Sequence, residues 1–133
     1  MSRDSPAIAP ARESAQSEID DRVIARVLSA YIAFATLWLL FATGIGVVLA
    51  YKFGAPDFGP GPWLTFGRLR PIHTNATFYG WSSIALVGLA YYVAVRSSRT
   101  PLYSAKLAWL GLVLFNVAAL AGTVALDLGY NDG

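Results

Sequence analysis

The chain has 133 residues and no cysteine, and 56% of its residues are hydrophobic while only 14% are charged. Average soluble domains hold roughly 45–50% apolar and roughly 25% charged residues, so the composition excludes a disordered chain, an ordinary soluble domain, a disulfide scaffold and thiol chemistry. The net charge of +2 is too small and too scattered to indicate nucleic-acid binding, and the single histidine excludes a two-histidine metal site within one copy of the chain.

Residues 1–17 are predicted to form a disordered polar tail. They contain Pro6 and Pro10, several serines and alanines, and charges of both signs. Residues 17–20 (SEID) have the form of a helix start, in which a hydroxyl cap is followed by acids in the first turn. The first helix is therefore expected to begin near residue 18, before the chain enters a membrane.

Three charge-free runs follow, each at least 20 residues long, at 27–51, 72–95 and 107–126. A helix of about 20 apolar residues crosses the hydrocarbon layer, where the backbone must satisfy its own hydrogen bonds. The alternative, a buried hairpin in a large soluble protein, is disfavoured because so short a chain has nothing to bury three such helices against. We expect an all-α membrane unit over residues 18–133, with transmembrane helices near 18–52, 70–96 and 102–127.

The basic residues beside the spans predict the orientation of the chain. Arg22 and Arg26 precede the first span, and the 52–71 loop is itself basic. Between the second and third spans, with no acid among them, lie Arg96, Arg99 and Lys106. We expect the N-terminus to be cytoplasmic, and the 52–71 loop and the C-terminus to face outward.

Polar chemistry is concentrated where the second span begins, at residues 66–75 (FGRLRPIHTN). Pro71 fits the first helical position, which would put His73 in the first turn, just inside the outer face. A neutral imidazole there is a good axial ligand for haem iron, and Arg68 and Arg70 could hold the two propionates through paired hydrogen bonds. The alternative is an interfacial histidine that only makes hydrogen bonds.

One helical stripe continues from His73 at offsets of 4, 7, 11, 15 and 18, and its members are Thr77, Gly80, Ile84, Gly88 and Tyr91. Glycines on such a stripe could let a flat macrocycle approach the backbone, which makes Thr77 and Gly80 candidate haem contacts. Spacing alone favours the simpler interpretation that Gly80 and Gly88 let helices pack closely.

The remaining polar and small residues of the spans indicate contacts between helices. Asn116 and Thr123 in the third span are expected to hydrogen-bond to neighbouring helices. Six glycines invite more close contacts than three helices are expected to satisfy, and these are Gly44, Gly46, Gly80, Gly88, Gly111 and Gly122. We expect the isolated chain to aggregate or to need detergent and partners.

Residues 63–76 (WLTFGRLRPIHTNA) closely resemble the entrance to the second helix in subunit I of the haem–copper oxidases. The resemblance is greatest to the C-type, or cbb(3)-type, cytochrome c oxidases, which also carry an aromatic group near the far end of this helix, like Tyr91 and Tyr92. The resemblance is strong over residues 63–95 and loose over residues 27–62 and 96–133. The related nitric oxide reductases have the ligand histidine in a similar setting.

The resemblance implies that His73 is one of two axial histidines on the low-spin haem b, with Arg68 and Arg70 beside it. It implies that electrons arrive from c-type cytochrome subunits and pass to a high-spin haem and copper, where oxygen is reduced to water and protons are pumped. It also implies an integral protein of the bacterial inner membrane. Such subunits form a bundle of about twelve helices, and their second axial histidine, copper ligands and high-spin haem ligand lie on later helices.

We therefore expect this chain to be the N-terminal part of such a subunit, either a truncated reading frame or a separately encoded piece. It would act with the remaining helices of subunit I or with a complementary chain, and would have no activity alone. The alternatives are a fragment of a nitric oxide reductase-like subunit, and a small free-standing membrane haem protein in which two copies each supply His73. A third is a scaffold without a cofactor.

Overall fold

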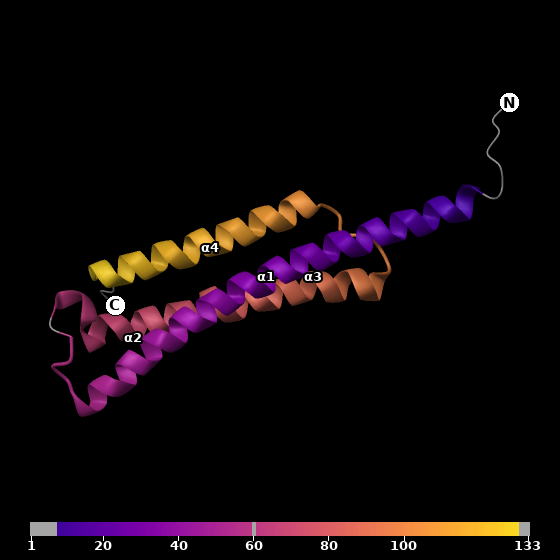
Figure 1. The fold of residues 1–133 in the computed structure, drawn as a ribbon. Helices are drawn as coiled ribbons and strands as arrows, with labels where there is room; N and C mark the ends of the chain where they lie inside the picture. The colour runs from indigo at the N-terminus through magenta and orange to yellow at the C-terminus, as the bar shows by residue number, and fades with distance from the viewer. Residues whose placement is uncertain (1–7, 60, 131–133) are drawn as a thin grey trace.

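The computed structural model describes residues 8–59 and 61–130, and every regular element in these ranges is helical. The elements are α1 (Ile8–Gly54), the short η1 (Pro62–Leu64), a second span made of α2 (Phe66–Asn75), η2 (Ala76–Ser83) and α3 (Ile84–Ser98), and α4 (Ala105–Leu128). Three of the resulting helices are long and apolar enough to cross a membrane. Figure 1 shows them as adjacent rods, with the N-terminal part of α1 extending past the other two. The predicted all-α membrane architecture is confirmed.

α1 begins at Ile8, so residues 8–17 are helical where the sequence predicted an irregular tail. Pro10 lies in the first turn, where its missing N–H removes no helical hydrogen bond. Alanine, arginine, glutamate and glutamine, which favour helix, dominate the next turns. One turn further on, Arg22 pairs with Glu18 at 3.6 Å across four positions. The rest of the predicted tail, residues 1–7, lies outside the described residues.

The second span starts at Phe66, earlier than the predicted residue 70, and Pro71 lies inside the helix rather than at its first position. Thr65 caps the helix in an extended conformation, and its carbonyl accepts the Leu69 N–H at 3.0 Å. Pro71 has no N–H, so the Gly67 carbonyl in the first turn lacks its usual helical donor. His73 consequently lies in the second turn of α2, not in the first.

The middle of the second span widens into a π-helical segment, η2. The Ser83 side-chain hydroxyl donates a hydrogen bond to the carbonyl of Phe78, five residues earlier, at 2.8 Å. From Ile72 onward the buried residues of this span recur at every fourth position, and they are Ile72, Ala76, Gly80, Ile84 and Gly88. A four-residue step overshoots an α-helical turn and falls short of a π-helical one, so mixing the two keeps this set on one face.

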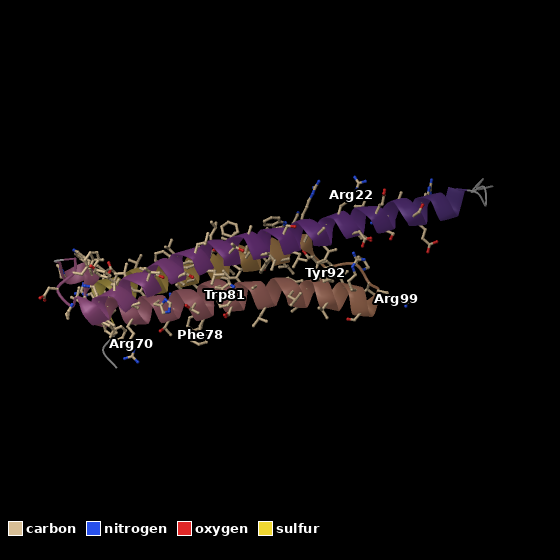
Figure 2. All side chains as sticks on the ribbon, turned by 60° about the horizontal axis from the view of Figure 1, so that its bottom comes forward. Arg22, Arg70, Phe78, Trp81, Tyr92 and Arg99 are labelled. Carbon is tan, nitrogen blue, oxygen red and sulfur yellow. The ribbon has the colours of Figure 1, made fainter. Side chains whose placement is uncertain are left out.

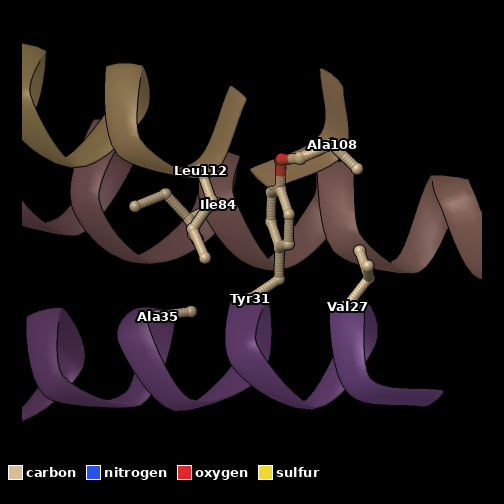
Figure 3. Packing of buried hydrophobic residues seen from close by; sticks show 6 residues of the cluster. All are labelled: Val27, Tyr31, Ala35, Ile84, Ala108 and Leu112. Atoms are coloured by element: carbon tan, nitrogen blue, oxygen red, sulfur yellow. The ribbon is translucent and has the colours of Figure 1, made fainter. Parts of the chain in front are cut away.

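Six buried side chains join the three spans near the middle of α1, and they are Val27, Tyr31, Ala35, Ile84, Ala108 and Leu112. Tyr31 stands at the centre, where its ring rises from α1 toward α4 (Figure 3). Its hydroxyl donates to the Ala108 carbonyl at 2.7 Å, and the Tyr91 ring meets it edge-on at 5.7 Å. The hydroxyl of a buried tyrosine needs a hydrogen-bond partner, so the bond to Ala108 fixes how α1 is placed along α4.

Two polar contacts connect the helices within the apolar region. Trp38 of α1 donates from its indole to the Asn116 amide oxygen of α4 at 3.0 Å. Asn75 of α2 donates to the Ala119 carbonyl at 3.0 Å and to the Thr123 hydroxyl at 3.1 Å. The prediction that Asn116 and Thr123 bond to neighbouring helices is confirmed. Such bonds contribute about 0.6 kcal/mol each on average within a membrane.

At five of the six glycines predicted to make close contacts, another side chain of this chain occupies the space beside the glycine. A Cβ atom at these positions would lie within 3.0 Å of another side chain, and the glycine–neighbour pairs are Gly46 with His73, Gly80 with Trp38, Gly88 and Gly111 with Tyr31, and Gly122 with Asn75. Only Gly44 among the six has no atom within 4 Å. The three described spans therefore do not satisfy all six glycines, as the sequence predicted, and Gly44 is the one left without a contact. Large apolar side chains still cover the outside of the bundle, where lipid or further helices would contact them.

Candidate functional site

His73 projects from α2 toward α1 and is half-buried between the two helices. Its Nδ1 atom lies 2.8 Å from the carbonyl oxygen of Ala42. Its ring lies against Gly46, one turn further along α1, where an added Cβ would be 3.0 Å from Cε1. The imidazole therefore packs against α1 between the Ala42 carbonyl, which bonds to Nδ1, and Gly46, which has no side chain to displace the ring.

The contact with Ala42 determines the tautomer of His73. A carbonyl oxygen can only accept a hydrogen bond, so the proton must be on Nδ1. In the neutral ring the lone pair is then on Nε2, for which no hydrogen bond is found within the described residues. A histidine whose Nδ1–H is held by a backbone carbonyl has the orientation and basicity of a metal ligand. The described residues contain no group of three or more metal-ligating side chains.

Arg68, predicted to meet a propionate, faces α4 instead of the His73 side of the helix. Its guanidinium donates to the Asp127 carbonyl at 2.6 Å and stacks over the Trp63 ring at 5.4 Å. It also lies beside Gly129, whose φ of 94° ends α4 in a left-handed turn. Arg68 therefore holds the C-terminal end of α4 against the entrance of the second span.

Arg70 is exposed, and its side chain points away from α1 (Figure 2). Within the described residues its guanidinium makes no hydrogen bond or ion pair. Phe78 projects from the same side of the span (Figure 2) and is exposed as well. The structure thus places the two predicted arginines on different faces, and Arg70 is the one still available to a ligand.

Thr77 and Gly80 both have partners inside this chain. The Thr77 hydroxyl donates to the His73 carbonyl at 2.8 Å, which braces the turn carrying the imidazole. Gly80 faces the Trp38 ring, and an added Cβ would come within 2.4 Å of it. At Gly80 the structure shows the helix-packing alternative, since the indole occupies the space beside the backbone.

Sequence reasoning did not identify Ala42, Gly46 or Trp38 as parts of this region. A backbone acceptor such as the Ala42 carbonyl has no signature in sequence. Gly46 was recognised only as a packing residue, and nothing indicated that its neighbour would be the single histidine. The fold, with three helices long and apolar enough to cross a membrane, defines an integral membrane protein whose single imidazole leaves Nε2 without a hydrogen bond among the described residues.

Comparison with known proteins agrees with this class. The family described as cytochrome c and quinol oxidase polypeptide I matches residues 26–132. The chain is 31% identical over 108 residues to the Cbb3-type cytochrome c oxidase subunit CcoN1 of Stutzerimonas stutzeri, a match that covers 80% of this chain and 23% of that protein. It is also 31% identical over 104 residues to a cytochrome c oxidase subunit 1 homolog of Agrobacterium tumefaciens, covering 77% and 19%.

A cytochrome c oxidase subunit 1 of Rhodobacter capsulatus is 30% identical over 112 residues, covering 80% of this chain and 21% of that protein. The chain belongs to the subunit I family of the cytochrome c and quinol oxidases. It spans about a fifth of the length of the curated relatives that it matches. The predicted resemblance to subunit I of the haem–copper oxidases is confirmed.

Proposed function

We propose that this chain provides His73 as one of the two axial ligands of a low-spin haem b in a cbb(3)-type terminal oxidase. The observation that carries the proposal is the hydrogen bond from Nδ1 to the Ala42 carbonyl, which presents Nε2 as the ligand atom. A haem held in this way supplies reversible one-electron transfer. In the complete oxidase, electrons come from c-type cytochrome subunits, oxygen is reduced to water and protons are pumped.

Several residues of this chain would position the His73 imidazole, each through a different contact. The Ala42 carbonyl fixes the imidazole plane and raises the basicity of Nε2. Thr77 braces the backbone turn of His73, while Gly80 lets Trp38 pack and so sets the distance between α1 and the second span. The second axial histidine, the copper ligands and the high-spin haem would come from the remaining helices of subunit I or from a complementary chain.

Arg70 is proposed as the main propionate partner, and Arg70→Ala should lower the midpoint potential of the low-spin haem while leaving it six-coordinate. Oxidised haem carries one more positive charge than reduced haem, so a nearby cation disfavours oxidation and its removal favours it. The hydrogen bonds at stake are worth about 1.5–3 kcal/mol. A redox titration followed optically measures the shift.

Arg68→Ala is the matched control, because it removes the same charge two residues away from the opposite face. It should loosen the end of α4, through loss of the bond to the Asp127 carbonyl, and change the potential less. An equal or larger shift in Arg68→Ala would contradict the assignment of Arg70.

The proposed topology has a cytoplasmic N-terminus in the bacterial inner membrane, and single cysteines test it. Phe58→Cys should react with an impermeant maleimide applied from outside, whereas Ser98→Cys should react only after the cells are opened. Both positions are exposed, and the natural chain contributes no cysteine of its own. Labelling of both variants from the same side would contradict the proposal.

The oxidase activity is tested on the complex purified through a tag on this chain. Oxygen consumption with reduced cytochrome c as donor supports the proposal. Consumption of nitric oxide but not oxygen would point to the nitric oxide reductase-like alternative. A bis-histidine haem bound by two copies of this chain, with no other subunit present, would point to the small dimeric haem protein.

A further inference from the structure

We propose that Gly46 is a positioning residue for the haem ligand: its missing side chain lets the His73 ring lie close against α1 and keep its hydrogen bond to the Ala42 carbonyl. The inference rests on the proposed role of His73. It adds that α1, which itself contributes no ligand, sets the plane and the electronic character of the axial imidazole.

The distances leave little room at this contact. A Cβ on residue 46 would lie 3.0 Å from Cε1, 3.4 Å from Nδ1 and 3.7 Å from Nε2 of His73. Optimal carbon–carbon contact is roughly 3.5–4.0 Å, so a methyl group would press on the ring edge that includes Nδ1. The Thr77 hydroxyl bonds to the His73 carbonyl at 2.8 Å, which braces the backbone turn that carries the ring. Relief therefore requires rotation or displacement of the imidazole.

Rotation of the ring would weaken the bond between Nδ1 and the Ala42 carbonyl, which is 2.8 Å long. That bond pulls on the Nδ1 proton and makes Nε2 a stronger donor to iron. A stronger donor favours the oxidised state of the metal. Weakening the bond should therefore raise the midpoint potential, the opposite of the shift expected for Arg70→Ala.

Gly44 provides a matched control two residues away on the same helix. A Cβ at residue 44 would meet no atom within 4 Å. Gly44→Ala and Gly46→Ala make the same chemical change in the same charge-free stretch of α1, so they have similar effects on helix propensity and hydrophobicity. A difference between them isolates the contact with His73.

The test compares both variants in the complete oxidase by electron paramagnetic resonance and redox titration. We expect Gly46→Ala to keep a six-coordinate low-spin haem, to shift its lowest-field g value, which reports the imidazole planes, and to raise its midpoint potential. Gly44→Ala should match the unmodified protein in both measurements. Unchanged spectra and potential in Gly46→Ala, or equal shifts in both variants, would overturn the inference.

A second measurement needs no variant and covers the case in which Gly46→Ala does not assemble. Electron–nuclear double resonance of the oxidised protein, exchanged into deuterium oxide, should detect a strongly hydrogen-bonded Nδ1 deuteron on an axial imidazole. Only weakly bonded deuterons on both ligands would overturn the inference. The proposed function fails separately, if His73→Ala retains the low-spin haem. If His73→Ala loses that haem while Gly46→Ala behaves as the unmodified protein, only the role of Gly46 is rejected.

Discussion

In the complete oxidase, His73→Ala should abolish the low-spin haem b spectrum and stop electron transfer to the oxygen site. The substitution removes one of two strong-field nitrogen ligands, so the iron would become five-coordinate or take up water, and both states favour high spin. Apolar contacts with the surrounding helices would still hold some of the macrocycle. The expected loss is therefore one of spin state and electron transfer more than of total haem.

Resonance Raman and optical spectra of the reduced and oxidised protein measure this change. Thr74→Ala is a suitable control, because Thr74 is the next residue, is exposed, and uses its hydroxyl only for the Arg70 carbonyl at 3.1 Å. It should keep the low-spin spectrum. An intact six-coordinate low-spin haem b in His73→Ala would overturn the site assignment and most of the proposed function.

The three spans could be predicted from sequence because the hydrocarbon layer of a membrane imposes a simple constraint on composition. Charges are excluded from the hydrocarbon, so the blocks ending at Arg26 and resuming at Lys52 bracket the first span directly. Helix ends outside the membrane follow weaker local preferences. That is why the starts at Ile8 and Phe66 differ from those predicted near residues 18 and 70.

The position of the helix start also bears on the two arginines. With Pro71 at the first helical position, Arg68 and Arg70 would both lie just outside the helix, where both could meet the haem propionates. In a helix that begins at Phe66 they are two residues apart, which is about 200° around the axis. One therefore meets α4 and the other points away from the bundle.

The sequence singles out His73 as the candidate ligand by its residue type and setting, but it could not predict which atoms of α1 would contact the imidazole. The Ala42 carbonyl is a backbone atom that every residue type offers, and only the packing of α1 against α2 brings it within 2.8 Å. The π-helical segment was missed for a related reason. A regular 3.6-residue stripe fits Gly80 and Gly88 well enough that nothing in the sequence requires a wider turn between them.

Gly88→Ala should produce the largest loss of stability among single-methyl additions to this chain. A Cβ at residue 88 would lie 2.4 Å from the Cβ of Tyr31, and that atom is fixed to the α1 backbone and cannot rotate away. The two helices would have to separate by about 1 Å or more to reach ordinary contact. Overpacking of this kind costs about 1–3 kcal/mol, and a shift of Tyr31 would also weaken its bond to the Ala108 carbonyl, worth about 1 kcal/mol.

Titration of the purified protein with SDS in mixed micelles measures this loss as a lower midpoint of unfolding. The sign of the effect separates packing from helix propensity, because replacing a mid-helix glycine by alanine stabilises a helix by roughly 0.5–1 kcal/mol when space is available. Gly44→Ala, with nothing within 4 Å, should therefore raise the midpoint while Gly88→Ala lowers it. Equal midpoints in the two variants would mean that α1 and α3 are not in contact at Tyr31, and the arrangement of the three spans around that residue would have to be revised.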